Sequence, residues 1–582
     1  MIIVLLCISL ITIPLIVVLK LLKPIPLVLY FLFFFLFVGG VFSYLDQIYL
    51  IIPILGYGSL SYLILMNWIK KQPLWQTPPT TLIFTLQLLL GVLSFGIPFI
   101  VSAIQFLADD SLSKDKKFIA GLKLYETPKK AFKELKKILK NATGIDLGIG
   151  VRIPKELEVF NTIFVGGMGS GKTTTLLSII EQISNRKNEP TTIFDFKGDY
   201  TEIFFDDSTI LLSPLDFRSQ GWDIGADVRT EADAQEFARN LVHSSLDSGH
   251  DGSNFFALAA IDCITGAIVA CQKEHKNWNF GHLTSVLNDQ KKIIAKLQQF
   301  RPAALLSLAD SDQKDGGKQS AGVFGTIRVC TQVLEIFSKS WDTKKEKFSV
   351  HSFLTEPGQK KMLILRFIER YSAVSQFFVT QILTSYFQTV MSLPDDVNRR
   401  IHTFLDELGV LQTISSLPSI LKVGRSKGHC IWGGLQEVSS IDTRYKSYGG
   451  KETILNGFSN RFIGRAETEE FARYWSESFG ITKFERKNKQ TSVSGSNTSK
   501  STSKIIVEEH LISSGELLAL PVATKEKGGE FFLKLAGSPY VFKLCLPIQF
   551  TNKKAEALIL EPWLTEDSFS KPVQKIPEKP RF

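Results

Sequence analysis

The sequence predicts an α/β protein in which a parallel sheet carries a phosphate-binding loop. An all-α subdomain is expected as an insertion in that sheet domain, with membrane-spanning helices in front of it. Three observations support this prediction. A strand-like run leads through a glycine-rich loop into a helix-like run at 162–180. A strand–helix–strand order recurs over 360–405, as in parallel sheets. Residues 1–108 are almost wholly apolar and carry only five charges.

The first 108 residues predict about four membrane helices. Each apolar segment is close to the ~20 residues needed to cross a bilayer core. Only residues 20–24 separate the first two, so one segment is alternatively re-entrant or interfacial. Lysine counts on the two sides of the predicted spans are equal, so the charge bias does not orient them. The segments lie at 2–19, 25–44, 48–69 and 82–107.

Most of the formal net charge of +10 lies after residue 108. A basic body predicts polyanionic partners, either nucleic acid or anionic lipid, although many proteins of this charge bind neither. The 6 cysteines form no Cys-x-x-Cys pair, and the 8 histidines form no His-x-x-x-His. We therefore expect a reducing compartment, without a structural zinc site or a disulfide framework.

Residues 127–140 predict a short amphipathic helix just after the membrane region. Six lysines lie on or around the face opposite the apolar one. Three interpretations stay open: attraction to an anionic membrane leaflet, a DNA-facing rim, or an ordinary surface helix. The apolar face holds Ala131, Phe132, Leu135, Ile138 and Leu139.

The glycine-rich loop fits the pattern G-x-x-x-x-G-K-[ST]. Its glycines allow backbone N–H groups to turn toward phosphate, and the following helix adds the partial positive charge of its N-terminus. We expect Lys172 to reach the β- and γ-phosphates of ATP and Thr173 to hold Mg²⁺ through its hydroxyl. The residues expected to bind the nucleotide are Gly166, Gly167, Gly169, Ser170, Gly171, Lys172, Thr173 and Thr174.

A second motif, at 401–409, is an apolar strand that ends in two carboxylates. Asp406 is expected beside Mg²⁺ at the carboxyl end of the strand, and Glu407 is expected to activate water as a general base. The alternative is a strand end with two solvated carboxylates. A glutamate directly after the Mg²⁺ aspartate favours repeated ATP hydrolysis over a kinase reaction.

A third stretch, at 420–441, contains two further catalytic candidates. Arg425 lies in a glycine-flanked turn and is expected to act as an arginine finger on the nucleotide of a neighbouring subunit. The alternative is a basic surface residue. Gln436 ends a second buried strand, where a polar side chain near the γ-phosphate can report hydrolysis to the rest of the domain.

Taken in this order, the motifs resemble the type IV secretion coupling proteins of the TraD/TrwB kind, the membrane-anchored ATPases of conjugation. The resemblance covers about residues 145–560. It departs from the family pattern at Ser213, where asparagine is usual, and at Phe196, where proline is usual; four spans also exceed the usual two. The matching stretches are "GGMGSGKTT" at 166–174, "IFDFKGDY" at 193–200, "SPLDFRSQGWDI" at 213–224, "FLDELG" at 404–409 and "GRSKG…GLQ" at 424–436.

The resemblance implies a RecA-like nucleotide domain in a homo-hexameric ring. It also implies partners: DNA or a relaxase–DNA complex, and components of a type IV secretion channel. Membrane lipid is a further expected partner, because of the apolar segments within 1–108. The protein is then expected in the bacterial inner membrane as a multi-pass protein with its ATPase domain in the cytoplasm. By similarity, the residues assigned to hydrolysis are Lys172, Asp406, Glu407, Arg425 and Gln436.

Apolar periodicity predicts an all-helical subdomain at 229–345, either a DNA-contacting insert, as the resemblance implies, or a structural lid. Residues 486–504, rich in Ser, Thr and Lys, predict a mobile loop. The other expected divisions are the membrane region 1–108, a juxtamembrane segment 109–144, the nucleotide domain 145–228 and 346–562, and a disordered tail 563–582.

The function predicted from these patterns is coupling of ATP hydrolysis to DNA or nucleoprotein translocation into a type IV secretion channel. Two alternatives stay open. One is a non-motor receptor that binds nucleotide for assembly and presents secretion substrates. The other is a related DNA motor of the FtsK/HerA kind, or a pilus-assembly ATPase.

Overall fold

The computed structural model describes residues 116–139, 143–245, 254–308, 316–356, 361–494, 497–548 and 551–564. The four predicted spans, and all but the first two residues of the predicted tail, lie outside this part of the chain. The chain forms two compact units: Phe118–Phe484 with Ile506–Phe582, and Met1–Lys117 with Glu485–Ile505. In the described ranges one helix is long and apolar enough to cross a membrane, Phe255–Glu274, and most of it is buried in the protein.

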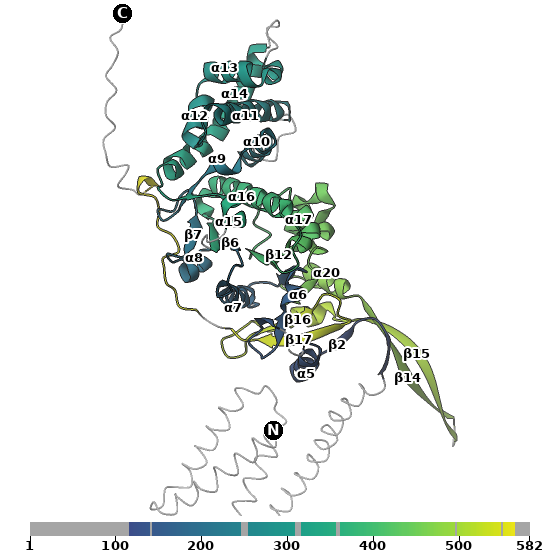
Figure 1. Cartoon of the computed structure of the whole chain (residues 1–582). Coiled ribbons are helices and arrows are strands. Elements are labelled where there is room, and N and C mark those ends of the chain that lie inside the picture. Colours follow the sequence, from purple (N-terminus) through teal and green to yellow (C-terminus); the bar gives the residue numbers. More distant parts are fainter. Residues whose placement is uncertain are drawn as a thin grey trace, which may run out of the picture. The chain divides into compact units, whose positions relative to one another are not determined.

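The larger unit is built on a ten-stranded sheet with the strand order β2-β17-β16-β13-β5-β12-β11-β6-β10-β7 (Figure 1). Seven strands, β13 through β7 in that order, run parallel. Two antiparallel strands, β16 (Gly529–Lys534) and β17 (Tyr540–Leu546), extend the sheet, and β2 (Lys123–Tyr125) pairs with β17 in parallel. The parallel strands are β5 (Thr162–Val165), β6 (Thr191–Asp195), β7 (Thr209–Leu212), β10 (Met362–Arg366), β11 (Ile401–Leu405), β12 (His429–Leu435) and β13 (Asn460–Ile463).

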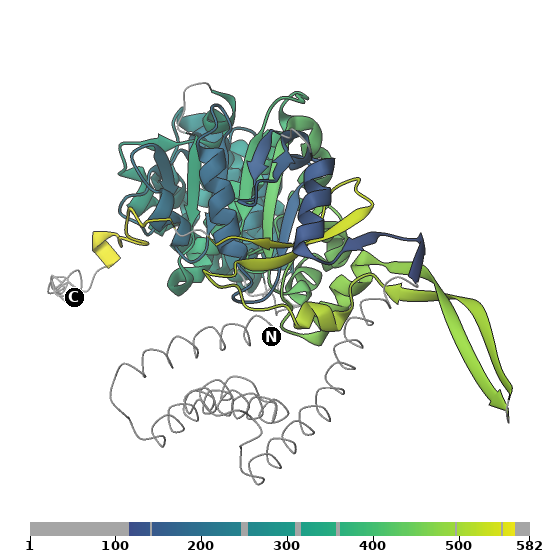
Figure 2. The same ribbon diagram turned by 90° about the horizontal axis from the view of Figure 1, so that it is seen from below.

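Helices cover both faces of this sheet (Figure 2). Alternate residues of β5 enter different cores: Phe164 packs with one set of helices, Ile163 and Val165 with the other. The strands are apolar throughout because both of their faces are buried. One face carries α5 (Pro128–Ile138), α7 (Lys172–Ser184) and α8 (Asp199–Phe204). The other carries α16 (Ser372–Ser392), α17 (Leu417–Val423), α18 (Val438–Arg444), α19 (Gly450–Leu455) and α20 (Glu469–Phe479).

The predicted amphipathic helix is present as α5, and its apolar face belongs to the core of the sheet domain. Ala131 and Leu135 are fully buried, and α5 packs on β17. Because Ala131 and Leu135 are enclosed by protein, these two side chains are not available to enter a lipid interface. Lysines such as Lys130 and Lys133 are exposed, so the three interpretations stay predictions.

Between β8 (Gly221–Trp222) and β9 (Lys347–Phe348) the described chain is helical. These two short strands pair in parallel, which brings the two ends of the insertion together. Trp222 is buried there against Phe237, Phe280 and Trp341. The helices are α9 (Ile224–Asp227), α10 (Glu231–Ser245), α11 (Asn254–Glu274), α12 (Phe280–Leu287), α13 (Gln290–Phe300), η5 (Pro302–Ser307), α14 (Gly316–Phe337) and the π-helix η6 (Ser338–Asp342).

Where the composition predicts a mobile loop, at 486–504, the structure has two long strands. They are β14 (Ile481–Ser494) and β15 (Asn497–His510), neighbours in a three-stranded sheet with β1 (Lys116–Ala120). The loop prediction is therefore wrong over the described part of this range. A long two-stranded ribbon needs little apolar core, so a polar composition does not exclude strands here.

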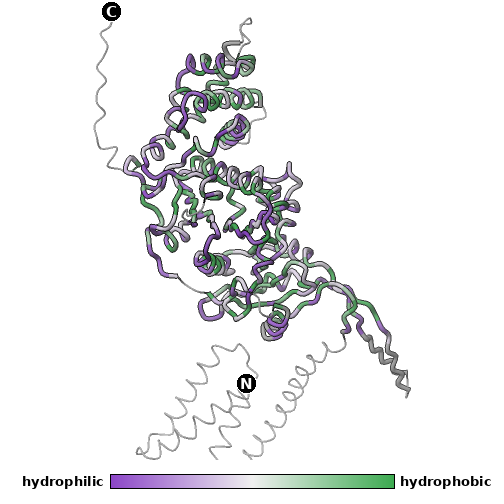
Figure 3. Tube along the Cα trace, in the orientation of Figure 1, coloured by the Kyte–Doolittle hydropathy of each residue, from purple (hydrophilic) through white to green (hydrophobic). Residues whose placement is uncertain are grey.

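Hydropathy along the chain follows the two cores, with apolar segments in the sheet and its facing helices (Figure 3). The remaining elements connect these layers. They are β3 (Gly144–Asp146), β4 (Arg152–Pro154), α6 (Lys155–Glu158), α15 (Val350–Thr355), η7 (Glu369–Tyr371), η8 (Gly424–Lys427), η9 (Lys446–Tyr448), α21 (Ser514–Leu518) and η10 (Pro562–Leu564).

Candidate functional site

The phosphate loop connects β5 to α7, as the sequence predicts. Gly169 and Gly171 have φ values of +69° and +91°, a backbone region that favours glycine. A segment from far along the chain packs on the loop: the Ala523 N–H donates to the Gly169 carbonyl over 2.8 Å. A Cβ at Gly171 would lie 3.3 Å from Ala523 Cβ, so the loop is closely covered on this side.

Lys172 and Thr173 begin α7 and point their polar atoms into the loop and toward β11. The Lys172 ammonium is buried and donates to the carbonyls of Gly166 and Gly167. Burial lowers the pKa of Lys172, although the negative charges of Glu407 and Asp406 oppose this shift. Thr173 Oγ1 donates to Asp406 Oδ2 over 3.2 Å. Thr174 Oγ1 caps the same turn by donating to the Gly171 carbonyl over 2.9 Å.

Asp406 follows the last residue of β11 and fits a divalent cation. Its Oδ1 is buried and has no hydrogen-bond partner in the described part of the chain, while Oδ2 faces the Thr173 hydroxyl. Burial raises the pKa of Asp406; the nearby Tyr200 hydroxyl, followed by the positive charge of Lys172, opposes that shift. A carboxylate oxygen and a hydroxyl at a phosphate site are ligands that Mg²⁺ accepts beside phosphate oxygens and water.

Glu407 lies beside the same strand end and is held by Gln436. Gln436 Nε2 donates to Glu407 Oε2 over 2.6 Å. Burial raises the pKa of Glu407, whereas the charge of Lys172 and the Gln436 hydrogen bond lower it. A carboxylate held beside a phosphate loop is the type of group that accepts a proton from an attacking water.

The structure thus brings together the phosphate loop, Asp406, Glu407 and Gln436. They follow β5, β11 and β12, which are adjacent in the sheet, so their carboxyl ends meet at one edge. Arg425 is not part of this group. It lies in η8, before β12 begins, and therefore at the opposite edge of the sheet. Its guanidinium carbon is 4.0 Å from the centroid of the Phe160 ring.

Not every group of the phosphate loop faces a phosphate position. The Gly167 N–H donates to the Arg465 carbonyl over 2.8 Å, so a protein acceptor already satisfies it. The Ser170 hydroxyl is buried and has no hydrogen-bond partner in the described ranges. A polar group buried without a partner suits a ligand that supplies one.

The sequence patterns missed Glu467, which contacts the loop directly. Its Oε1 accepts a hydrogen bond from the Met168 N–H over 2.8 Å. A Cβ at Gly167 would lie 2.3 Å from Glu467 Cγ, so the glycine makes room for this side chain. Glu467 follows β13, the neighbour of β5, and only that strand pairing brings the two segments together.

Hydrogen bonds from Asp195 and from Arg366 hold the turn after β6. The Asp195 carboxylate accepts from the N–H groups of Gly198 and Thr201, both over 2.8 Å, and from the Thr201 hydroxyl over 2.6 Å. Arg366 donates to the Phe196 carbonyl over 2.8 Å. Asp195 therefore shapes the turn. Since β6 lies beside β11, the exposed Lys197 of this turn lies near Lys172 and Asp406, and its charge lowers the pKa of both groups.

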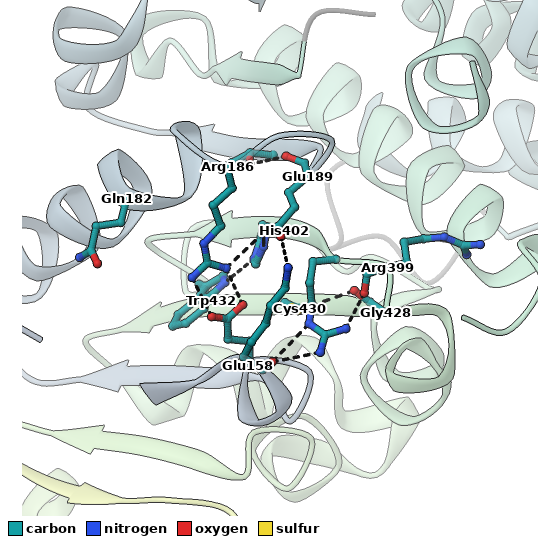
Figure 4. Close-up of polar contacts among 12 residues, drawn as sticks. Glu158, Gln182, Arg186, Glu189, Arg399, His402, Gly428, Cys430 and Trp432 are labelled. Carbon is teal, nitrogen blue, oxygen red and sulfur yellow. Dashed lines mark hydrogen bonds and ion pairs between the residues drawn. The ribbon is translucent and has the colours of Figure 1, made fainter. Parts of the chain in front are cut away.

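A buried ionic cluster lies at the opposite edge, below the C-terminus of α7 (Figure 4). Arg186 donates to both oxygens of Glu158 over 2.9 Å each and to Glu189 over 3.2 Å. Ring nitrogens of His402 meet Glu189 over 3.0 Å and Trp432 over 3.2 Å. Ligand atoms of Glu158, Glu189 and His402 lie within 4.8 Å of one another. However, Arg186 and Lys155 together neutralise the two carboxylates and both His402 nitrogens have partners, so the cluster is an ion-pair network and not a metal site.

A parallel sheet with a phosphate loop and catalytic-type side chains at its carboxyl edge defines the class of α/β nucleotide-binding proteins. The sequence model of a protein family, described as the type IV secretion-system coupling protein DNA-binding domain, matches residues 147–525. The chain belongs to this family, which confirms the resemblance seen in the motifs.

Individual relatives are distant in sequence and similar in fold. The coupling protein TraD of Escherichia coli (strain K12) is 22% identical over 456 residues, covering 75% of this chain and 59% of TraD. The present chain thus spans about three-fifths of the length of that relative. The unbound conjugative coupling protein TrwBdeltaN70 has a TM-score of 0.62 at 20% identity, covering 76% of this chain and 97% of its own. TrwB in complex with ADP and Mg²⁺ has a TM-score of 0.62 at 19% identity, covering 76% and 98%.

Proposed function

We propose that this protein is a membrane-anchored ATPase that moves DNA, or a relaxase–DNA complex, toward a type IV secretion channel. The observation that supports it most is the convergence of Thr173–Asp406 and Gln436–Glu407 on the phosphate loop. Structures of TrwB with ADP and Mg²⁺ and with the non-hydrolysable ATP analogue ADPNP support the choice of nucleotide and metal.

Each residue of the site has a role in this proposal. The loop N–H groups and Lys172 bind phosphate, and Thr173 with Asp406 holds Mg²⁺, which neutralises phosphate charge when bound. Glu407 takes a proton from the attacking water, and Gln436 keeps its carboxylate oriented and ionised. Arg425 of one subunit stabilises the transferring phosphate in the site of the next subunit.

The surroundings of the site are part of the same proposal. The apolar segments within 1–108 anchor the chain as a multi-pass inner-membrane protein, and the nucleotide domain lies on the cytoplasmic side, where ATP is present. The nucleotide domain is RecA-like, comprises 145–228 and 346–562, and assembles as a homo-hexamer. The helical subdomain at 229–345 is an insertion in it.

ATP hydrolysis by the full-length protein in detergent, with and without single- or double-stranded DNA, tests this function. We expect DNA to stimulate hydrolysis and Glu407→Gln to lower kcat by roughly 10²–10⁴-fold. Glu470→Gln, the same change at an exposed position on α20, serves as the matched control. The contrary outcome is that the wild type binds ATP and yet hydrolyses none of it, either without DNA or with single- or double-stranded DNA. In that case the non-motor receptor becomes the better description.

A further inference from the structure

Arg425 presents its guanidinium to an aromatic ring, that of Phe160. The residue is exposed, and its guanidinium carbon lies 4.0 Å from the Phe160 ring centroid. No ion pair or side-chain hydrogen bond of Arg425 is found in the described part of the chain. Its N–H donors therefore stay free for an anion, while one planar face of the group rests on the ring.

The ring itself is fixed by anchors on both sides of Phe160. Glu158, two residues before Phe160, is fully buried and forms a bidentate ion pair with Arg186 (Figure 4). Arg186 in turn follows α7, the helix that begins at the phosphate loop. This places the ring on a segment that cannot shift without breaking a buried ion pair.

One residue after Phe160, Asn161 has a left-handed φ of 47° and is almost fully buried. Its Nδ2 donates to the carbonyls of Leu421 over 3.3 Å and Gly457 over 3.0 Å. Its Oδ1 accepts from the Ile431 N–H over 2.9 Å. Asn161 thus ties the ring's segment to α17 and β12, the two elements between which Arg425 lies.

We propose that Phe160 is a positioning residue for Arg425: its ring holds the guanidinium in the orientation that meets the phosphates of a nucleotide bound by a neighbouring subunit. This inference rests on the proposed function of Arg425. The physical reason is that an exposed arginine has many rotamers, and a fixed ring face restricts them before the subunits meet. The ring also leaves the edge donors of the guanidinium open toward the anion.

The test compares Phe160→Leu, which keeps an apolar side chain without a ring face, with Phe160→Tyr, which keeps the ring. In DNA-stimulated ATP hydrolysis by the full-length protein, we expect Phe160→Leu to lower kcat roughly 3- to 30-fold with an unchanged KM for ATP. Phe160→Tyr should retain wild-type kcat. In an Arg425→Ala background, Phe160→Leu should cause no further loss. A loss that persists undiminished in that background would show a general structural role and overturn the proposal.

A second measurement does not depend on hydrolysis. Phenylglyoxal modifies exposed guanidinium groups, and peptide mass spectrometry gives the rate for Arg425 alone. Without nucleotide, Arg425 should be modified several-fold faster in Phe160→Leu than in the wild type or Phe160→Tyr. Equal rates in all three would overturn the proposal even if the ATPase function holds. Absence of hydrolysis by the wild type would instead overturn the proposed function, and the modification rates would still report whether the ring holds Arg425.

Discussion

Gln436 donates a hydrogen bond to Glu407 over 2.6 Å, and the two residues follow neighbouring parallel strands, β12 and β11. The bond stabilises the ionised carboxylate of Glu407, whose pKa burial would otherwise raise further. The protonation state of the proposed base therefore depends on a side chain from the next strand.

Replacing Gln436 by leucine should move the acid limb of the pH–rate profile to higher pH. Without the hydrogen bond the pKa of Glu407 rises, so a larger fraction is protonated and inactive at a given pH. We expect kcat/KM at pH 7 to fall by about 10-fold and to recover partly at pH 9. The measurement is kcat/KM for ATP from pH 5.5 to 9, with the exposed Gln298→Leu as control. A uniform loss at every pH would contradict this role.

Removing the Thr173 hydroxyl should raise the Mg²⁺ concentration that nucleotide binding requires. Thr173→Val keeps the shape and loses the oxygen that faces Asp406, whereas Thr173→Ser keeps it. We expect the valine variant to need roughly 10-fold more Mg²⁺ for half-maximal ATP binding, and the serine variant to behave like the wild type. Titration of a fluorescent ATP analogue against Mg²⁺ measures this. Equal Mg²⁺ requirements for valine and serine would rule Thr173 out as a ligand.

Two inactive variants should restore activity when mixed. Arg425 and Glu407 lie at opposite edges of one sheet, so an arginine finger has to serve a neighbour's site. A Glu407→Gln subunit still offers its arginine, and an Arg425→Ala subunit still offers its base. Co-assembled subunits should hydrolyse ATP at a rate well above the sum of the separate variants. Strictly additive rates in verified mixed oligomers would place Arg425 outside catalysis.

Buried His429 should make the protein sensitive to mild acid. Burial lowers the pKa of His429 to about 3, and its Nε2 lies 2.9 Å from the Thr403 hydroxyl. In the unfolded chain a histidine has a pKa near ~6.5, so between these values the unfolded state binds more protons. The free energy of unfolding should therefore fall as the pH falls below 6.5, by up to about 1.4 kcal/mol per pH unit.

His429→Gln keeps a polar side chain beside Thr403 and removes the titrating group. Its thermal stability relative to pH 7 should decline less between pH 6.5 and 5 than that of the wild type. The exposed His510→Gln, which is remote from β12 in the chain, is the control for loss of a histidine. If wild type and His429→Gln lose stability in parallel, another group controls the acid response.

Local patterns were sufficient to predict the centre of the site. Lys172, Thr173, Asp406, Glu407 and Gln436 all follow apolar strands, and parallel strands end at the same sheet edge. Glu467 could not be predicted in this way, because its contact with the loop depends on the pairing of β13 with β5 across some three hundred residues of sequence. Phe160 gave no signal either, since nothing local relates it to Arg425.

The central part of the fold was also predictable from local patterns, whereas the edge of the sheet was not. Strand–loop–helix patterns indicated the parallel core, whereas β2, β16 and β17 join its edge through contacts that no short window contains. The strands β14 and β15 were mistaken for a loop because of their composition. In the sequence, Gly495 and Ser496 lie between two runs that contain Thr and Val, and this order is a typical hairpin signal. Amino-acid composition alone does not contain that signal.

The separation of Arg425 from the phosphate loop also means that any assembly using it must join unlike edges of two subunits. Two subunits related by a two-fold axis can meet this requirement only as a closed pair, in which the Arg425 of each subunit reaches the phosphate site of the other. A head-to-tail contact also joins unlike edges, and it closes as a cyclic ring or continues as a filament. Every subunit in a closed ring would then donate one arginine and receive one, whereas an open chain of subunits would leave one unserved site at its end.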